Sequence, residues 1–268
     1  MKPVEVKRGD SPIVLGLPHT GIYLPEDVYA RLTPMGQTLA DTDWHIDRLY
    51  GGLLPDVTTV RATFHRYLID ANRDPSGRSL YPGQNTTGLV PLTDFDGEPL
   101  WLDPPSEEEV EERRLNYHAV YHAALQEELE RIHRQHGSVI LYDCHSIRSY
   151  IPFLFEGVLP DFNIGTNGGV TCAAEAESAV VNICEAAEGC SSITNGRFKG
   201  GWTTRHYGNP DAGFHAIQME LAQSTHLKSE TAPFEYDSVK AENLRKILKS
   251  VLVALTEFAT LKTEASHV

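Results

Sequence analysis

The stretch SVILYDCHSIRSY, residues 138–150, decides how the rest of the chain is interpreted. Its apolar, β-branched start, VILY at 139–142, is typical of a buried strand. The run leads directly into Asp143, Cys144 and His145, whose side chains have chemistry that an ordinary core does not need. In open α/β sheets, ligands bind at the carboxyl ends of the strands. The stretch therefore predicts both a class of fold and the place of a site.

Similar runs recur along the chain, with helical segments between them. Strand character is found at residues 12–17, 58–64, 66–70, 152–157, 191–194 and 214–220. Helices are expected over about residues 106–136, 173–188 and 238–261. The first of these helices opens at Ser106 before three glutamates and closes at Gly137. Because strands and helices alternate, we expect one α/β domain over residues 1–268, with a sheet covered by helices.

The composition limits the possible partners. The 37 acidic residues outnumber the 23 basic ones, which gives a formal charge of −14. Nucleic acids and anionic membranes need a basic surface, so neither is expected as a partner, and an anionic substrate must be bound by local arginines. The chain begins without the pattern of a signal peptide and has no apolar run near the roughly 18 residues that span a bilayer. A cytoplasmic protein is expected.

The cysteines also agree with an intracellular protein. Cys144, Cys172, Cys184 and Cys190 form no CxxC pattern. In an intracellular chain of this length, such cysteines are better interpreted as free thiols than as a disulfide framework. One long segment, residues 74–103, is rich in Gly, Pro, Thr and Asp and is expected to be an ordered, functional loop.

Polar residues accumulate where strands are expected to end. His19 follows the first strand, His145 ends the fourth, and the segment LADTDWHIDRLY between them is dense in aspartates. A catalytic zinc site commonly has two histidines, one carboxylate and an open position for water. His19, Asp43 and His145 meet that requirement.

Two alternatives use other residues. His118 and His122 stand at i and i+4 on a helix, a spacing that can hold zinc, but the glutamate of an HExxH motif is missing and tyrosines repeat at the same interval. A packed helix face is the favoured interpretation of this pair. Cys144 beside His145 suggests a nucleophile pair, but neighbouring residues of a strand point to opposite faces, so Cys144 is expected to be a core thiol.

Two further stretches supply candidate catalytic groups. In YLIDANRDPSG, Asn72 and Arg73 follow a strand, where an arginine can bind a carboxylate through two hydrogen bonds. In GFHAIQMELAQ, Glu220 has the position of a general base for a metal-bound water. The simpler interpretations are a surface pair of Arg73 with Asp74 and a solvated Glu220.

Taken in order, the segments PHTGIYLP, DTDWHIDRLY, IDANRDPSG, LYPGQNTTGLVP, YDCHSIRS and QMEL resemble the N-formylglutamate amidohydrolase (N-formylglutamate deformylase) family over about residues 10–225. That family is related to the zinc carboxypeptidases and aspartoacylases. The resemblance therefore implies a zinc-exopeptidase-like (phosphorylase/hydrolase-like) fold, with a mixed central sheet flanked by helices on both faces.

The resemblance also implies roles for single residues. It makes His19 and His145 metal ligands, Asn72 and Arg73 a substrate clamp, and Glu220 the base. The HxxE pair of the relatives is absent, because the residue three after His19 is an isoleucine. The carboxylate ligand is therefore assigned to an aspartate of the DTDWHIDRLY segment: Asp43, with Asp41 and Asp47 as alternatives.

The activity implied is metal-dependent hydrolysis of N-formyl-L-glutamate to L-glutamate and formate, in a histidine-degradation route. Zinc is the expected cofactor, with another divalent transition metal as an alternative. The substrate is a small anion, so Arg73 is expected to bind it first, followed by Arg148 and Arg205. The segment 196–208 is expected to be a mobile loop over the pocket, where His206 or His215 adds a hydrogen bond.

Two other classes of function stay open. One is a related zinc-dependent N-acyl amino acid deacylase, or an amidase or peptidase, because the acyl group is selected by pocket width. The other is a non-enzymatic domain that binds small acids. Asp143 and Ser146 are expected to orient the ring of His145. The sequence does not decide between a monomer and a homo-oligomer.

Overall fold

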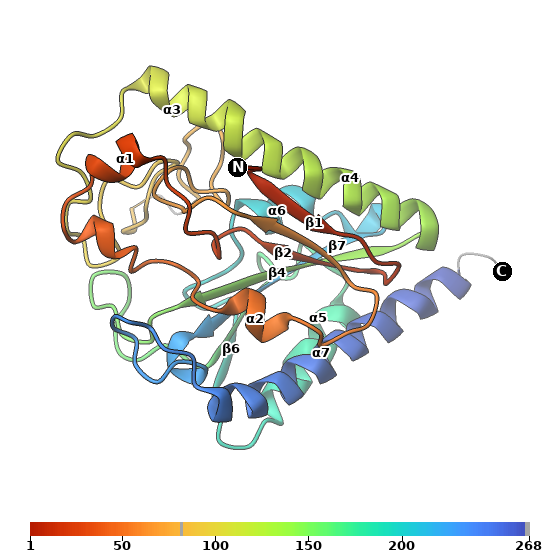
Figure 1. Ribbon diagram of the computed structural model, residues 1–268. Coiled ribbons are helices and arrows are strands. Elements are labelled where there is room, and N and C mark those ends of the chain that lie inside the picture. Colours follow the sequence, from red (N-terminus) through yellow and green to blue (C-terminus); the bar gives the residue numbers. More distant parts are fainter. Residues whose placement is uncertain (81–82, 266–268) are drawn as a thin grey trace.

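Seven strands form one mixed sheet through the middle of the molecule (Figure 1). The computed structural model describes residues 1–80 and 83–265. The strands are β1 (Val4–Lys7), β2 (Ile13–Leu17), β3 (Thr58–Ala62), β4 (Val139–Ile147), β5 (Phe162–Gly165), β6 (Ser192–Thr194) and β7 (Phe214–Ala222). Their order is β1-β3-β2-β4-β7-β5-β6, and the central four, β3, β2, β4 and β7, run parallel. The edge strand β1 pairs antiparallel with β3, β5 pairs antiparallel with β7, and the other edge strand, β6, pairs parallel with β5.

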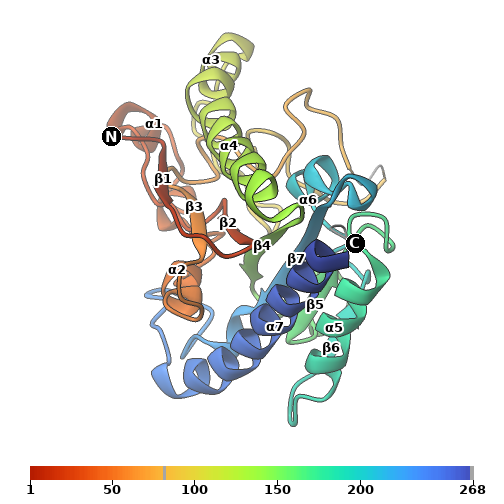
Figure 2. The ribbon, with the colours of Figure 1, turned by 90° about the vertical axis from the view of Figure 1, so that its right-hand side faces the viewer.

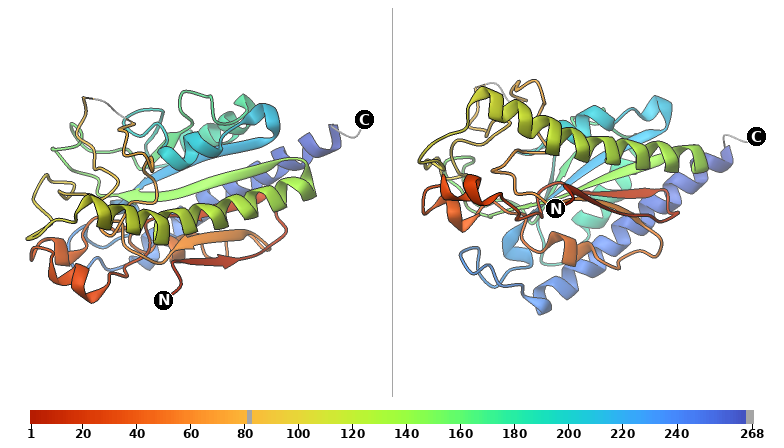
Figure 3. Two further views of the ribbon diagram at one scale, coloured as in Figure 1. Left: turned by 90° about the horizontal axis from the view of Figure 1, so that it is seen from above. Right: turned by 45° about the horizontal axis from the view of Figure 1, so that its top comes forward.

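Helices cover both faces of this sheet, which confirms the predicted class of fold. The α-helices are α1 (Glu26–Ala30), α2 (Ile46–Tyr50), α3 (Glu107–Arg113), α4 (Ala119–His136), α5 (Ala174–Glu185), α6 (Trp202–Tyr207) and α7 (Ser238–Ala265). A π-helical turn, Arg114–His118, joins α3 to α4. In Figure 2, α4 lies on one side of the sheet, and α2 and α7 lie on the other. The loops that follow the parallel strands gather at one end of the molecule (Figure 3).

The alternation of side chains along β4 divides the core into two layers. Ile140, Tyr142 and Cys144 pack with α2, α5 and α7, whereas Val139 and Leu141 pack with α4. Because neighbouring residues of a strand point to opposite faces, the reactive end of β4 is sorted in the same way. Cys144 lies in the first layer, fully buried, as predicted for a core thiol.

The helix limits follow the signals in the sequence. Ser106 and Glu109 form a capping box at the start of α3, with each side chain bonded to the backbone of the other. Gly137 ends α4 with a φ of 70°, a conformation that glycine adopts without a steric penalty. The predicted helix 106–136 is thus present, interrupted by the π-helical turn.

Two expected strands are wrong. Residues 66–70 include a turn, in which the backbone N–H of Leu68 donates to the carbonyl of His65 at 2.9 Å and Arg66 pairs with Asp70 at 2.7 Å. Residues 152–157 form turns in which two backbone N–H groups donate to the carbonyl of Ile151. Leu154 and Phe155 of this second segment pack, partly buried, against a small separate cluster, whereas Phe153 is exposed, so the segment does not join the sheet. Short apolar runs do not by themselves distinguish a strand from a packed turn.

The sequence prediction also missed β1 and β5. Three of the four residues of β1 are exposed, so this edge strand lacks an apolar pattern.

The segment 196–208 contains α6, so half of the expected loop is a helix. The described residues of 74–103 contain no helix or strand, as expected of a long loop. All four cysteines are free thiols. None of the helices that the structure describes is both long and apolar enough to span a bilayer.

Candidate metal centre and substrate pocket

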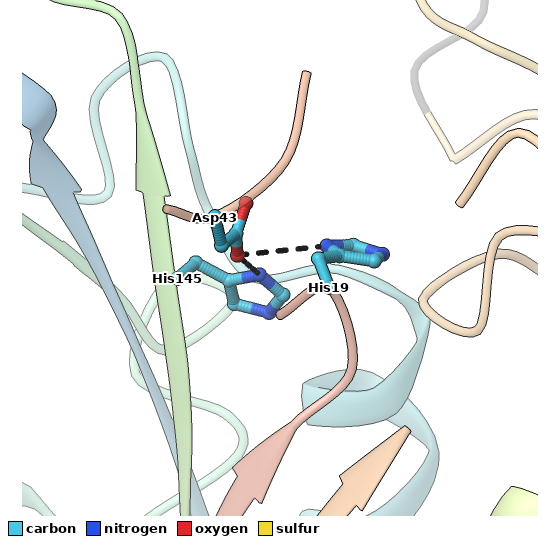
Figure 4. A group of neighbouring side chains, drawn as sticks. All are labelled: His19, Asp43 and His145. Atoms are coloured by element: carbon cyan, nitrogen blue, oxygen red, sulfur yellow. Dashed lines mark hydrogen bonds and ion pairs between the residues drawn. The ribbon is translucent and has the colours of Figure 1, made fainter. Parts of the chain in front are cut away.

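Three side chains predicted as metal ligands converge at the carboxyl ends of the parallel strands. His19 follows β2, Asp43 precedes α2 and His145 lies near the end of β4. Oδ2 of Asp43 is 3.1 Å from Nδ1 of His145 and 3.7 Å from Nδ1 of His19 (Figure 4). One ligand atom from each residue lies within 4.8 Å of the others, and all three residues are buried. The spacing suits a single metal ion held between them.

The other two aspartates of the segment are used elsewhere. Asp41 accepts the backbone N–H of Phe95 through Oδ2, at 3.0 Å. Asp47 has a side chain that is 46% exposed and lies at the surface. Of the three alternatives, the structure brings Asp43 to the two histidines.

The outer nitrogen of each histidine is held by a carboxylate. Nε2 of His19 lies 2.7 Å from Oδ1 of Asp70, and Nε2 of His145 lies 3.1 Å from Oδ2 of Asp143. Such contacts fix the ring orientation and place the proton on Nε2, which leaves Nδ1 free to bind a metal. Nδ1 of His19 is buried and has no hydrogen-bond partner among the described residues. The donor set therefore fits a metal ion. Ser146, the other expected partner of His145, lies near Gln223 instead.

The charges around the group also favour a bound cation. Burial raises the pKa of Asp43, but the neighbouring rings of His145 and His19 outweigh it and hold that pKa below its ordinary value. Burial lowers the pKa of His145, but Asp143 and Asp43 outweigh it and raise that pKa well above its usual range. Negative charge thus surrounds both rings, and buried carboxylates need a positive partner. A divalent cation would supply it.

Glu220 lies beside this group on the neighbouring strand. It is the register partner of His145 across β4 and β7, so both side chains lie on the same face of the sheet. Its carboxyl is buried, which raises its pKa to about 8, and Nε2 of Gln218 donates to Oε2 at 3.2 Å. The alternative of a solvated Glu220 is excluded by this burial. A buried carboxyl beside a candidate metal group is placed to exchange protons with a water there.

A pocket opens over the group. The described residues that line it are His19, Arg66, Asn72, Arg73, Asn85, Thr86, Thr87, Phe95, His145, Ser146, Ile147, Leu154, Arg197, Phe198, Gly201, Gln218 and Glu220. The pocket thus holds the candidate base, two candidate metal ligands and three arginines.

The arginines differ in part from the expected ones. Arg73 lines the pocket as predicted, where its Nε and Nη2 donate to the carbonyl and hydroxyl of Thr87 at 2.9 Å each. Arg148 and Arg205 are not among the described residues of the lining. Arg148 pairs with Asp96 at 2.8 Å, and Nε of Arg205 donates to the carbonyl of Gly200 at 2.9 Å.

Arg66 and Arg197 take their place in the lining. Nη2 of Arg66 is paired with Oδ2 of Asp70 at 2.7 Å, and its buried Nε has no hydrogen-bond partner among the described residues. Arg66 was not predicted as a site residue, because it stands in a run interpreted as a strand. Arg197 stands in a segment with no periodic pattern, where charge alone could have drawn attention to it.

Asn72 connects the metal group to α6. Its Oδ1 accepts the N–H of Thr203 at 2.9 Å, in the first turn of α6, and its Nδ2 lies 3.1 Å from Nε2 of His145. Gly201 packs so closely that an added Cβ would come within 2.3 Å of the Asn72 side chain. Asn72 therefore positions protein groups at the pocket, and its expected contact with substrate stays a prediction.

The histidine pair on the helix has a structural role. Nε2 of His118 lies 3.0 Å from the carbonyl oxygen of Arg73, and Nε2 of His122 lies 2.7 Å from that of Ala71. The pair thus holds the backbone on either side of Asn72, which agrees with the packed-face interpretation. His206 stacks on Trp202, and His215 accepts the backbone N–H of Ala173, so neither is in the described lining.

The fold and the site together define an α/β protein with a candidate metal centre at its strand ends, an arrangement suited to a metal-dependent hydrolase. The chain belongs to the N-formylglutamate amidohydrolase family, which matches residues 11–227. It is 44% identical to the N-formylglutamate deformylase of Pseudomonas aeruginosa over 93% of this chain and 94% of that protein. It is 42% identical to the N-formylglutamate deformylase of Pseudomonas putida over 95% of this chain and 96% of that one. The resemblance predicted from the motifs is confirmed.

Solved structures show the same fold. The crystal structure of an N-formylglutamate amidohydrolase from Ralstonia eutropha superposes with a TM-score of 0.80 at 24% identity, covering 97% of this chain and 98% of that one. The structure of a gene product from Agrobacterium tumefaciens superposes with a TM-score of 0.71 at 16% identity, covering 96% of each chain. At these identities the likeness establishes the architecture.

Proposed function

We propose that this protein is a metal-dependent amidohydrolase that cleaves N-formyl-L-glutamate into L-glutamate and formate. Membership of the family and the names of its curated relatives support the reaction. The observation that carries the mechanism is the convergence of Nδ1 of His19, Oδ2 of Asp43 and Nδ1 of His145. A related N-acyl amino acid deacylase is the alternative.

Zinc is the metal we propose, held by His19, Asp43 and His145. Two imidazoles and one carboxylate are a common donor set for catalytic zinc, although other divalent transition metals accept the same ligands. When bound, the ion would lower the pKa of a water molecule and polarise the formyl carbonyl. A protein nucleophile is then unnecessary. Cys144 is a poor candidate for one, because burial raises its pKa well above the ordinary value and it lies in the opposite core layer.

The remaining steps belong to side chains of the pocket. Glu220 accepts the proton of the attacking water at its carboxylate and returns it to the departing amine nitrogen of glutamate. Arg66 presents a buried guanidinium to the pocket, where its charge stabilises the negative charge that develops on the formyl oxygen. Arg73, oriented by Thr87, binds a substrate carboxylate.

The deciding experiment compares N-formyl-L-glutamate with N-acetyl-L-glutamate and N-acetyl-L-aspartate, before and after removal of metal by a chelator. We expect activity on the formyl compound that is lost with the chelator and restored by zinc or another divalent ion. Activity that ignores the chelator would contradict the metal mechanism. Cleavage of an acetyl compound alone would favour the deacylase, and activity on none of the three would favour a binding domain.

Three further proposals concern the domain organisation, the cellular location and the pathway of the enzyme. Residues 1–268 are proposed to form a single catalytic domain, because all seven described strands belong to one sheet. A cytoplasmic location is supported by the four free cysteines. A place in histidine degradation rests on the family resemblance. Monomeric and homo-oligomeric forms are both compatible with the proposal.

A further inference from the structure

Two arginines of the pocket are fastened to the same short stretch of chain. Arg73 donates to the carbonyl and hydroxyl of Thr87, and Nη2 of Arg197 donates to the carbonyl of Asn85 at 3.0 Å. One residue, Thr86, separates these anchors and also lines the pocket. Because two residues of chain span at most about 7 Å, both guanidinium groups are held close together at one wall.

A second loop fixes Arg197 from another side. Its Nε donates to the carbonyl of Leu154 at 2.9 Å, and its guanidinium carbon lies 5.4 Å from the ring centre of Phe198. Nδ2 of Asn85 donates to the carbonyl of Phe153 at 2.8 Å, so the two loops are joined at this point. Arg197 is therefore held in place before a substrate arrives, which lowers the entropic cost of binding.

The partners of the three pocket arginines differ in charge. Arg66 is paired with Asp70 at 2.7 Å, whereas Arg73 is 3.8 Å from the same carboxylate and donates to the neutral Thr87. The two hydrogen bonds of Arg197 described above go to neutral carbonyl oxygens. These bonds orient the guanidinium, and a guanidinium that lines the pocket can bind a carboxylate through two parallel hydrogen bonds.

We propose that Arg197 selects the side-chain carboxylate of the substrate, while Arg73 binds the α-carboxylate. This inference rests on the proposed function and assigns the residue that recognises the second acidic group of the substrate. The α-carboxylate is attached to the carbon that bears the scissile amide, so it must lie nearer the metal group. Arg73 is the nearer arginine, because Asp70, which contacts it, also holds His19. The side-chain carboxylate lies two methylene groups further away, where Arg197 binds it.

The test compares N-formyl-L-glutamate with N-formyl-L-glutamine, which has nearly the same shape without the second charge. The wild-type protein should prefer the glutamate compound by about 100-fold or more in kcat/KM, because an unpaired charge in the pocket penalises the neutral analogue. In Arg197→Gln, kcat/KM for N-formyl-L-glutamate should fall by about 100-fold, chiefly through KM. The loss for N-formyl-L-glutamine should be much smaller, so the preference should nearly disappear.

Two controls separate recognition from a structural role. Arg73→Gln should lower kcat/KM for both substrates, because both carry the α-carboxylate. Arg197→Lys keeps a charge and should retain part of the preference, and it provides the same comparison if Arg197→Gln does not fold, as judged by thermal unfolding. An equal loss for both substrates in the Arg197 variants would overturn the inference and leave the proposed function intact. A wild-type protein that cleaves neither compound would overturn both.

Discussion

Asp70 is the residue on which most of the candidate site depends. Its Oδ1 lies 2.7 Å from Nε2 of His19 and accepts the N–H of Asn72 at 2.8 Å, while its Oδ2 pairs with Arg66 at 2.7 Å. Burial raises the pKa of Asp70, but Arg66 and His19 outweigh it and hold that pKa well below its usual range. One ionised carboxylate thus orients a candidate metal ligand, a charged pocket residue and the segment that carries Arg73.

Glu220 allows a direct test of proton transfer. In Glu220→Gln the side chain keeps its shape but can no longer accept a proton, so kcat should fall by about 10²- to 10⁴-fold. The metal content should stay unchanged, because the ligands proposed are His19, Asp43 and His145. The measurements are steady-state kinetics and metal analysis of the same samples. Near-normal kcat with full metal content would show that another group accepts the proton.

At the level of elements, the two histidines on either side of the junction between the π-helical turn and α4 hold the segment that carries Asn72. His118 ends this turn, and His122 follows one turn later on α4. Single π-helical turns are frequent at functional sites, because they change the direction in which side chains point. Here Nε2 of His118 lies beside the backbone carbonyl of Arg73, and Nε2 of His122 lies beside that of Ala71. The helix thus positions the loop that carries Asn72. The sequence pattern of the helix does not show which loop it contacts.

Replacing His122 should therefore affect both stability and activity. His122→Phe fills similar space but leaves the carbonyl of Ala71 without its donor, which should cost about 1–3 kcal/mol in the free energy of unfolding. Because Asn72 and Arg73 follow directly, kcat/KM should also fall. Urea unfolding and kinetics measure the two effects, with Gln135→Ala, on the exposed side of the same helix, as the control. Unchanged values for both would show that the contact does not position the loop.

At the level of the whole molecule, His226 joins the segment after β7 to the segment that carries Asp43. Its Nε2 lies 3.1 Å from the carbonyl oxygen of Trp44, and the neighbouring Gln223 donates to the carbonyl of Thr42 at 2.9 Å. His226 is fully buried, and this burial lowers its pKa to about 4. Parts of the chain 182 residues apart are thus fixed to each other beside the candidate metal group.

The burial of His226 predicts a loss of stability in acid. Because the folded-state pKa of His226 lies below the unfolded value near 6.5, the unfolded chain binds more protons between these values. The stabilising contribution is complete above pH 6.5 and is lost as the pH falls towards about 4, with a total of about 3 kcal/mol. Urea unfolding from pH 4 to 7 should show a shallower decline for His226→Gln than for the wild type. Parallel declines would exclude His226 as a source of the acid sensitivity.

The sequence by itself determined the class of fold and the two histidines of the candidate site. Strand alternation and the position of polar residues at strand ends are local patterns, and parallel strands bring their carboxyl ends to one edge whatever the loops do. For the same reason Cys144 could be assigned to the core, whereas the pairing of β7 with β4 places Glu220 on the face that carries His145. The predicted strands at 66–70 and 152–157 were wrong, because apolar side chains can be buried in a packed turn as well as in a sheet.

Only the tertiary structure decided which aspartate joins the histidines and which arginines reach the pocket. Asp41 accepts a hydrogen bond from the backbone N–H of Phe95 instead of joining the histidines, and Arg148 pairs with the carboxylate of Asp96 instead of lining the pocket. Arg197 faces the pocket because carbonyl groups of two distant loops hold it there. Each outcome depends on contacts between segments far apart in the chain. A charged residue in a loop has several possible partners of similar strength, and the packing of the loops selects among them.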